Sequence, residues 1–282
     1  MTDRRFGVST HLFHEERLTR DHLVHIAAHG FEAVEVFATR SHFDYANRAA
    51  IDEIAEWLSD TQLELHSMHA PAFEAVRDGQ WTNPFSIAAS SEDRRRRAVQ
   101  EAAAAIEVAA VIPYRYLVLH VGVPTRFAGA GDNVAEAARR SVEEIVQLAE
   151  ARSVGVALEV MPNTLSTAPA LVAMIEEELE GFDVGVCLDY GHAHLLGDLG
   201  EAVETLSGHL WTTHVHDNRG VQDDHLVPYA GSIDWDAAMM ETQKVGYEGA
   251  LMFEVAGGSD PLAVLQRTAK ARERLEKALV VY

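Results

Sequence analysis

The segment VGVALEVMPNTLSTAPALVAMIEEELEGFDVGVCLD, residues 154–189, carries the pattern that decides the fold. It begins and ends with a short apolar run, and the residues between them, 166–180, have the spacing of a helix. Each apolar run has a carboxylate near its end, Glu159 in the first and Asp189 in the second. The segment therefore predicts a strand–helix–strand unit with an acidic residue at the end of each strand.

The same alternation continues along all 282 residues, and no Pro/Gly/Ser-rich linker divides the chain. Strand-like runs lie at 6–10, 31–37, 63–69, 116–122, 154–160, 183–189, 210–216 and 250–255. Helical patterns lie at 21–29, 47–60, 92–112, 134–152, 166–180, 198–207, 234–245 and 260–278. This α/β pattern predicts a single (β/α)₈ barrel over residues 1–282. The alternative, a doubly wound open sheet, normally has a Gly-rich phosphate turn after an early strand, which this sequence lacks.

Composition excludes several classes of function. With 23 Lys and Arg against 44 Asp and Glu, the formal net charge is -21, which repels phosphate backbones and anionic membranes. The single cysteine, Cys187, excludes an intramolecular disulfide and indicates a reducing compartment. The N-terminus lacks the apolar stretch of a signal peptide, and no apolar run reaches the length of a membrane span. We expect a cytoplasmic protein without nucleic-acid or membrane partners.

From the third predicted strand onward, every strand ends in a potential metal ligand. These residues are His69, His120, Glu159, Asp189, His214 and Glu254. In a closed barrel the strand ends converge, and converging carboxylates repel each other unless a cation lies among them. Mixed carboxylate and imidazole ligands suit Zn²⁺, Mn²⁺ or Co²⁺ better than Ca²⁺. We therefore expect at least one divalent ion, Mn²⁺ or Zn²⁺ first, with Co²⁺ and Mg²⁺ as alternatives.

Two local motifs add further candidates. The segment CLDYGHAH places His192 three residues after Asp189 at the end of a strand. The segment HVHDNRGVQDDHLVPYAGSIDW adds His216, Asp223 and His225 beyond His214. Because His214 and His216 share one face of a strand, spacing alone leaves either of them as the ligand. Long connections at 70–90, 123–133 and 217–233 follow strands and should lie on the same face of the barrel.

These segments carry a resemblance to a known family. SMHAP, VLHVG, ALEVMPN, GVCLDYGHA, HVHDN, DDHLVPYAGSID and FEV, in this order, resemble the xylose-isomerase-like TIM-barrel superfamily of sugar isomerases, epimerases and endonuclease IV-type apurinic-site endonucleases. For the epimerase branch, the resemblance implies one ion held by Glu159, Asp189, His214 and Glu254. It selects His214 over His216 because the family pattern His-x-x-acid is met by His214 and Asp217. For the endonuclease branch, it implies three zinc ions held by His69, His120, Glu159, Asp189, His192, His214, Asp223, His225 and Glu254.

The loops favour the sugar-enzyme branch. The endonucleases insert bulky side chains into DNA, whereas the loop after His69 reads APAFEAVRDGQW, with Ala72 where a tyrosine is expected. The mouth loops are acidic, through Glu74, Asp78, Asp132, Asp223 and Asp224. The one basic run, 94–97, covers every face of a predicted helix and cannot form a single phosphate-tracking stripe.

The resemblance implies a divalent-metal-dependent isomerase or epimerase of a carbohydrate, working through an enediolate with Glu159 and Glu254 as acid and base. A keto-sugar or inosose dehydratase or lyase on the same site stays open, and an apurinic-site endonuclease is disfavoured by the charge. The expected substrate contacts are His192, His216, Arg219 and Glu35. Trp81, Phe13 and Phe37 are candidate walls of a sugar pocket, His11 and His14 are expected at the surface, and the oligomeric state, including a homo-oligomer, stays open.

Overall fold

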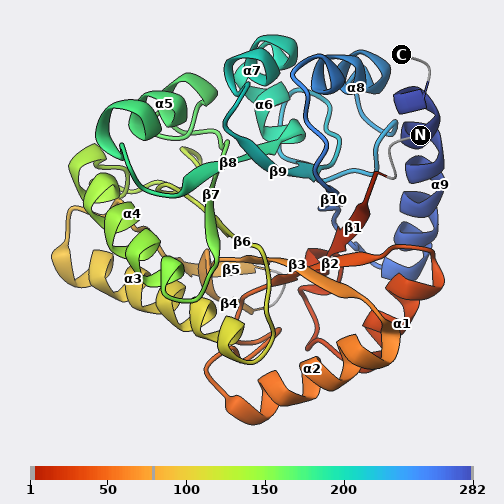
Figure 1. The fold of residues 1–282 in the computed structure, drawn as a ribbon, viewed down its shortest axis with the longest axis horizontal. Helices are drawn as coiled ribbons and strands as arrows, with labels where there is room; N and C mark the ends of the chain where they lie inside the picture. The colour runs from red at the N-terminus through yellow and green to blue at the C-terminus, as the bar shows by residue number, and fades with distance from the viewer. Residues whose placement is uncertain (1–3, 78–79, 281–282) are drawn as a thin grey trace.

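The computed structural model describes residues 4–77 and 80–280. Eight parallel strands close into a barrel, and β10 pairs with β1 to complete it, as Figure 1 shows. The barrel strands are β1 (Phe6–Ser9), β2 (Ala33–Phe37), β3 (Glu64–His69), β6 (Tyr116–Leu119), β7 (Gly155–Glu159), β8 (Val184–Asp189), β9 (Leu210–Val215) and β10 (Leu251–Phe253). The predicted (β/α)₈ barrel is confirmed, and every barrel strand falls within a predicted apolar run.

Helices surround the barrel and connect its strands (Figure 1). They are α1 (Arg20–Ala28), α2 (Arg48–Thr61), α3 (Glu92–Glu107), α4 (Ala135–Glu150), α5 (Ala168–Ala173), α6 (Tyr190–Leu196), α7 (Leu199–Thr205), α8 (Trp235–Lys244) and α9 (Pro261–Val280). The side chain of Asn47 caps α2, and that of Asp234 caps α8, through hydrogen bonds from backbone N–H groups of the first turn.

The structure contains elements that the sequence pattern did not predict, among them a 3-10 helix at Thr10–Phe13 directly after β1. The connection 70–90 contains an antiparallel hairpin, β4 (Phe73–Arg77) and β5 (Gln80–Pro84). Asp78, one of the acidic residues expected at the mouth, lies outside the described residues. Helix α6 begins directly after β8, because the Asp189 carboxylate accepts a 2.7 Å hydrogen bond from the backbone N–H of His192 and caps the helix. The predicted helix 166–180 is α5 followed by a π-helical turn, Met174–Glu178.

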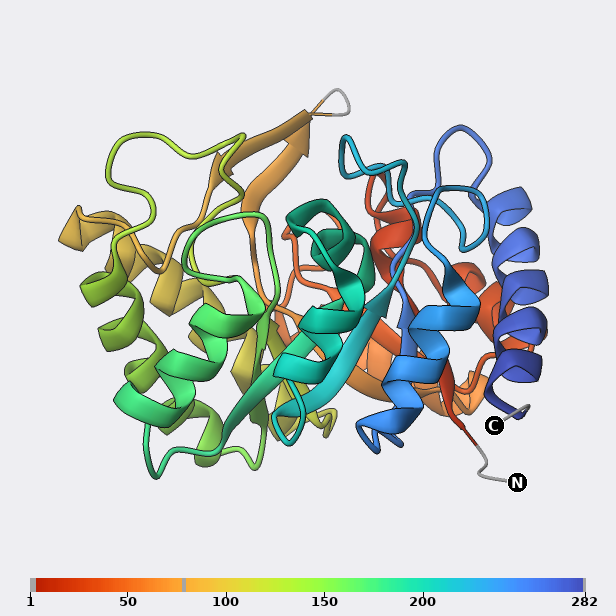
Figure 2. The same cartoon turned by 90° about the horizontal axis from the view of Figure 1, so that it is seen from above.

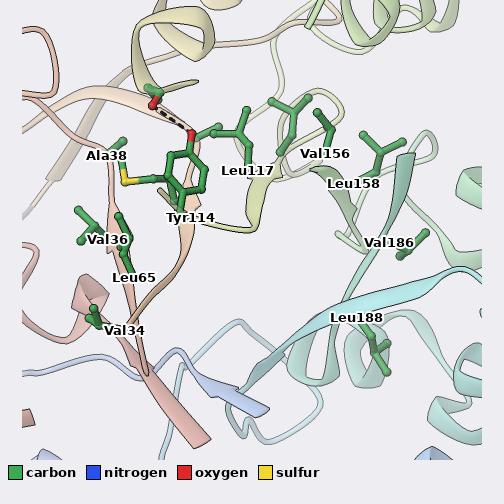
Figure 3. Packing of buried hydrophobic residues seen from close by; sticks show 14 of the residues in the cluster. Val34, Val36, Ala38, Leu65, Tyr114, Leu117, Val156, Leu158, Val186 and Leu188 are labelled. Atoms are coloured by element: carbon green, nitrogen blue, oxygen red, sulfur yellow. Dashed lines mark hydrogen bonds between the residues drawn. The ribbon is translucent and has the colours of Figure 1, made fainter. Parts of the chain in front are cut away.

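Strand residues alternate between two cores. Leu117, Val156 and Leu158 belong to the large core between the strands and the helices, part of which Figure 3 shows. The adjacent residues on the same strands, Val118 and Ala157, point to the other face and pack with Cys187 inside the barrel. Successive side chains of a strand point to opposite faces, so strand residues two positions beyond these interior ones also point into the barrel.

The long connections gather at one end of the barrel. Figure 2 shows the β4–β5 hairpin and the loops after β9 and β10 at this end, and the two chain termini at the opposite end. Because the strands are parallel, this end is the carboxyl end of all eight, where barrel enzymes hold their active sites. No helix among residues 4–77 and 80–280 is both long and apolar enough to cross a membrane.

Candidate metal centre

The alternation of side chains along the strands brings the predicted ligands together inside the barrel. Glu159 lies two residues after the interior Ala157, and Asp189 lies two residues after the interior Cys187. Both carboxylates therefore point into the barrel, at the last position of β7 and of β8. Both residues are fully buried, as is His214 on β9. Carboxylates in such a position need compensating positive charge.

The first ligand group consists of Glu159, Asp189, His214 and Glu254, each offering one ligand atom within 4.8 Å of the others. Nδ1 of His214 lies 3.3 Å from Glu159, 3.4 Å from Glu254 and 3.8 Å from Asp189. Ligand atoms about 2.1 Å from one ion stand about 3.0 to 3.4 Å apart at octahedral or tetrahedral angles. The spacing thus fits a single divalent cation facing Nδ1 of His214.

The other nitrogen of His214 is fixed from below. Its Nε2 lies 3.1 Å from the Glu35 carboxylate, and the Ser67 hydroxyl donates a 2.7 Å hydrogen bond to the same carboxylate. A carboxylate can only accept, so Nε2 carries the proton and Nδ1 is left to bind a cation. Burial alone would raise the pKa of Glu35, but the adjacent His214 lowers it to about 2.

The second group consists of His69, His120 and Glu159. Nε2 of His120 lies 2.9 Å, and Nε2 of His69 3.3 Å, from Glu159 Oε2. Yet this buried oxygen accepts no hydrogen bond from any described residue. The ligand atoms of this group lie within 4.8 Å of one another, close enough for all three residues to bind one cation. Glu159 belongs to both groups and would bridge two ions.

The third group consists of His192, His216, Asp223 and His225. Nε2 of His192 lies 3.2 Å, and Nε2 of His225 3.3 Å, from Asp223 Oδ2. Nδ1 of His225 lies 2.9 Å from the backbone oxygen of Glu254, which orients its ring. His216 approaches this group from β9, and its Nε2 also lies 3.0 Å from Asp189.

The pKa shifts of the clustered histidines and carboxylates indicate how their charges are balanced. Burial would lower the pKa of His225, but the Asp223 carboxylate raises it to about 9. Burial would likewise raise the pKa of Asp223, yet His225 and His192 hold it well below its usual range. Protons on imidazoles thus balance the carboxylates when no metal is bound, and a divalent cation would replace them. The residues present fit divalent metal ions.

A cavity of about 280 Å³ opens above these groups. Its floor includes His69, His120, Glu159, His192, Asp223, His225 and Glu254, so both predicted acid–base glutamates face it. One wall is aromatic: Trp81 on β5 lies 4.9 Å from Phe73 and 5.6 Å from Phe37, measured between ring centroids. The hairpin missed from sequence therefore supplies a wall of the candidate site.

Two further residues of the cavity were also missed. His11 and His14, expected at the surface, line it and stack on each other at 4.3 Å between ring centroids. His11 is only 7% exposed, its ring lies 4.8 Å from that of His225, and burial lowers its pKa well below its ordinary value. The available signal was their position directly after the first strand, at the barrel mouth. Phe13, a candidate pocket wall, is instead a core residue.

Three of the expected substrate contacts lie elsewhere. Glu35 and His216 are buried beneath the cavity and do not line it; Glu35 contacts His214 instead. Arg219 is exposed at the surface, with its guanidinium 3.6 Å from Asp224. His192 does line the cavity. The sequence placed Glu35 and His216 near strand ends, but the alternation of strand residues does not predict which of them reach the cavity.

The fold and the clustered ligand groups define a barrel with a candidate metal centre at its carboxyl end. The sequence profile of the family described as "Xylose isomerase-like TIM barrel" matches residues 23–278, and the chain belongs to that family.

Known proteins of similar sequence or structure cover nearly the whole chain. An uncharacterised protein of Methanocaldococcus jannaschii is 29% identical over 259 residues, covering 89% of this chain and 84% of that one. A D-tagatose 3-epimerase-like protein superposes with a TM-score of 0.79 at 25% identity, covering 98% of this chain and 97% of that one.

Two more distant structures share the fold. The 3-keto-D-glucoside 4-epimerase of E. coli has a TM-score of 0.76 at 16% identity, covering 98% of this chain and all of that one. The IOLI protein, solved with a zinc atom, has a TM-score of 0.77 at 18% identity, covering 99% of this chain and all of that one.

Proposed function

We propose that the protein is a divalent-metal-dependent isomerase or epimerase of a keto-sugar. The observation that carries the proposal is that Glu159 and Glu254 belong to one metal-ligand group and also face the cavity. Glu159 is the last residue of β7 and Glu254 directly follows β10, the fifth and eighth strands of the barrel, so they would approach a substrate from different sides of the mouth. Two carboxylates so placed can each exchange a proton with one substrate carbon or with neighbouring carbons.

The first ligand group would hold the metal through Glu159, Asp189, His214 and Glu254. A divalent cation there would supply Lewis acidity, which acidifies a C–H bond between a ketone and its neighbouring hydroxyl. Glu159 would remove that proton, and Glu254 would return one to the opposite face for epimerisation or to the adjacent carbon for isomerisation. His192, which lines the cavity beside them, would donate a hydrogen bond to a substrate oxygen.

The aromatic wall supports a sugar as the substrate. Trp81 and Phe37 border the cavity, and such rings pack against the apolar C–H faces of a sugar. The structural likeness to the D-tagatose 3-epimerase-like protein agrees with this class of substrate. A dehydratase or lyase would use the same first proton transfer and differ only in the bond broken afterwards.

A second candidate function rests on the three ligand groups. All nine residues that match the ligand positions of the endonuclease branch lie in the three groups, and Glu159 belongs to two of the groups. Three zinc ions held in this way could activate water against a phosphodiester. The charge opposes it: the formal net charge is -21, and Arg126, beside the cavity, faces Asp223 at 3.3 Å. We therefore place this function second.

Proton exchange tests the proposal directly. The protein loaded with Mn²⁺, Zn²⁺ or Co²⁺ is incubated in D₂O with a panel of ketoses, inososes and 3-keto-glycosides, and deuterium at carbon is measured by mass spectrometry. We expect exchange with at least one class, lost in Glu254→Gln and kept in Glu204→Gln, an exposed residue of α7. Absence of exchange with the whole panel would refute the proposal, and nicking of an abasic duplex would favour the second candidate.

A further inference from the structure

A second cavity, of about 780 Å³, lies between α9 and the loops after β9 and β10. We call it the α9 groove; its walls come from 224–230, 256–260 and the facing side of α9. It shares Asp224, His225 and Ala256 with the cavity above the metal ligands. Figure 2 shows the loops after β9 and β10 beside the start of α9. The loops after the seventh and eighth strands are where barrel enzymes frequently bind phosphate.

The groove has three cationic side chains on one helix face. Arg267, Lys270 and Arg274 follow the spacing i, i+3, i+7 along α9, and all three line the groove. All three are exposed, and none forms an ion pair with a carboxylate in the described part of the chain. Other arginines do, for example Arg139 with Glu143 at 2.6 Å. In a chain with a net charge of -21, free cations in a row are contrary to the general composition.

The carboxylates of the groove are already engaged. Asp260 accepts a 3.0 Å hydrogen bond from the backbone N–H of Ala263 in the first turn of α9. Asp224 lies 3.6 Å from Arg219 and accepts a 2.7 Å hydrogen bond from Gln222. Neither carboxylate is ion-paired with a cation of α9, and the three cationic side chains of the groove outnumber its two carboxylates by one.

Tyr229 supplies a second, independent feature. The guanidinium carbon of Arg274 lies 3.6 Å from the centre of the Tyr229 ring, which fixes the plane of the charged group. The Tyr229 hydroxyl is buried and has no hydrogen-bond partner among the described residues. Its backbone has a φ of 71°, a left-handed conformation that costs a non-glycine residue energy and is found disproportionately at ligand sites. Burial raises the pKa of Tyr229 to about 12, so its hydroxyl stays a donor at neutral pH.

We propose that the α9 groove binds the phosphate group of a phosphorylated small molecule. Two guanidinium groups and an ammonium match a phosphate in charge and in hydrogen-bond geometry, and the Tyr229 ring holds one of the guanidinium groups in place. The volume lies within the usual range for small-molecule sites. The phosphate has two possible sources, the sugar substrate itself or a separate effector. The first source rests on the proposed function, and the second does not.

Inorganic phosphate and pyrophosphate are the probes for the site itself. Binding to the metal-loaded protein is measured by calorimetry for the wild type, for the double variant Arg267→Gln/Arg274→Gln, and for Lys277→Gln. Lys277 is an exposed residue of α9 that does not line the groove, so its replacement controls for the loss of a positive charge from this helix outside the groove. We expect at least roughly tenfold weaker binding in the double variant, because each arginine makes a charge-assisted hydrogen bond, and no change in the control.

Three results would overturn the proposal. The first is an absence of binding at about 10 mM phosphate, a concentration that reveals even millimolar affinity. The second is equal binding by the wild type and the double variant. The third is binding that disappears when a chelator removes the metal, because the phosphate would then be a metal ligand. Binding of a DNA duplex without binding of inorganic phosphate would also overturn it in favour of a nucleic-acid surface.

Kinetics with a ketohexose 6-phosphate and its unphosphorylated parent separates the two sources. If KM for the phosphorylated sugar alone rises in the double variant, the phosphate belongs to the substrate. If phosphate binding weakens while both KM values are unchanged, the phosphate belongs to a separate effector. Either result supports the groove as a phosphate site. Inactivity toward all sugars would refute the proposed function, while the calorimetric result for the groove would stand by itself.

Discussion

Replacing Glu35 by glutamine tests whether this carboxylate orients the His214 imidazole that would bind the metal. Glu35 is 1% exposed and lies 3.1 Å from Nε2 of His214, and the Ser67 hydroxyl holds the same carboxylate at 2.7 Å. The carboxylate keeps the proton on Nε2, so that Nδ1 points its lone pair at the first ligand group. It also makes the imidazole a stronger electron donor.

The magnitude follows from what each substitution leaves behind. Removing a carboxylate that supports a metal-bound histidine weakens metal affinity about 10- to 100-fold, or about 1.4 to 2.7 kcal/mol. In Glu35→Gln the amide oxygen can still accept from Nε2, so we expect the lower end of this range. In Glu35→Ala the Nε2–H group of His214 is buried without an acceptor, so we expect the upper end.

Competition with a chromophoric chelator measures the affinity for Zn²⁺ and Co²⁺, and thermal unfolding in excess chelator shows whether each variant still folds. Glu32→Gln, an exposed position three residues earlier, is the matched control. Unchanged metal affinity in folded Glu35→Ala would refute the reasoning. So would a raised KM with unchanged metal affinity, because Glu35 would then contact the substrate, as the sequence alone suggested.

Four further outcomes are expected. Glu254→Gln should lose most of its metal in elemental analysis, whereas Glu204→Gln should retain the wild-type stoichiometry. Trp81→Ala should raise the KM of a sugar substrate roughly tenfold with kcat little changed in steady-state kinetics, since the ring packs against bound sugar in the free-energy range of one aromatic contact. Burial lowers the pKa of His42 to about 4 in the folded protein, whereas the unfolded chain protonates this histidine near pH 6.5. The free energy of unfolding should therefore fall by about 3 kcal/mol as pH drops from about 6.5 to 4, and His42→Gln should remove this decrease in urea unfolding. The metal-loaded protein should not nick an abasic duplex near 0.1 M salt in a gel assay.

The sequence predicted the barrel and the inward-facing ligands because both follow from simple periodicities. A strand alternates with period two, and parallel strands in a closed barrel bring their carboxyl ends together. Glu159 and Asp189 are therefore neighbours for the same reason that Ala157 and Cys187 are. Nothing beyond the chain pattern was needed to place them.

The depth of a residue in the barrel could not be predicted in this way. Glu35 pairs in register with Ser67, whereas Phe37 pairs with His69. Glu35 therefore lies one layer below His69, beneath the candidate metal ligands rather than at the cavity. The depth of Glu35 in the barrel depends on the stagger between strands, which is set by packing and by the register shift after Val34. The alternation of residues along a strand does not encode this stagger.

Asp217, the acid of the His-x-x-acid pattern, holds the loop after β9 in place. Asp217 is fully buried, and its carboxylate accepts hydrogen bonds from the backbone N–H groups of Gly231 and Ile233 at 3.0 and 3.2 Å. The indole N–H of Trp235, at the start of α8, donates to it at 3.0 Å. Asp217 thus ties the two ends of the loop 217–233 together, and a Cβ on Gly231 would lie 2.3 Å from its carboxylate oxygen. The segment between them carries Asp223 and His225 toward the third ligand group and forms one wall of the α9 groove. One buried carboxylate thereby holds in place the loop that contributes residues to both candidate sites.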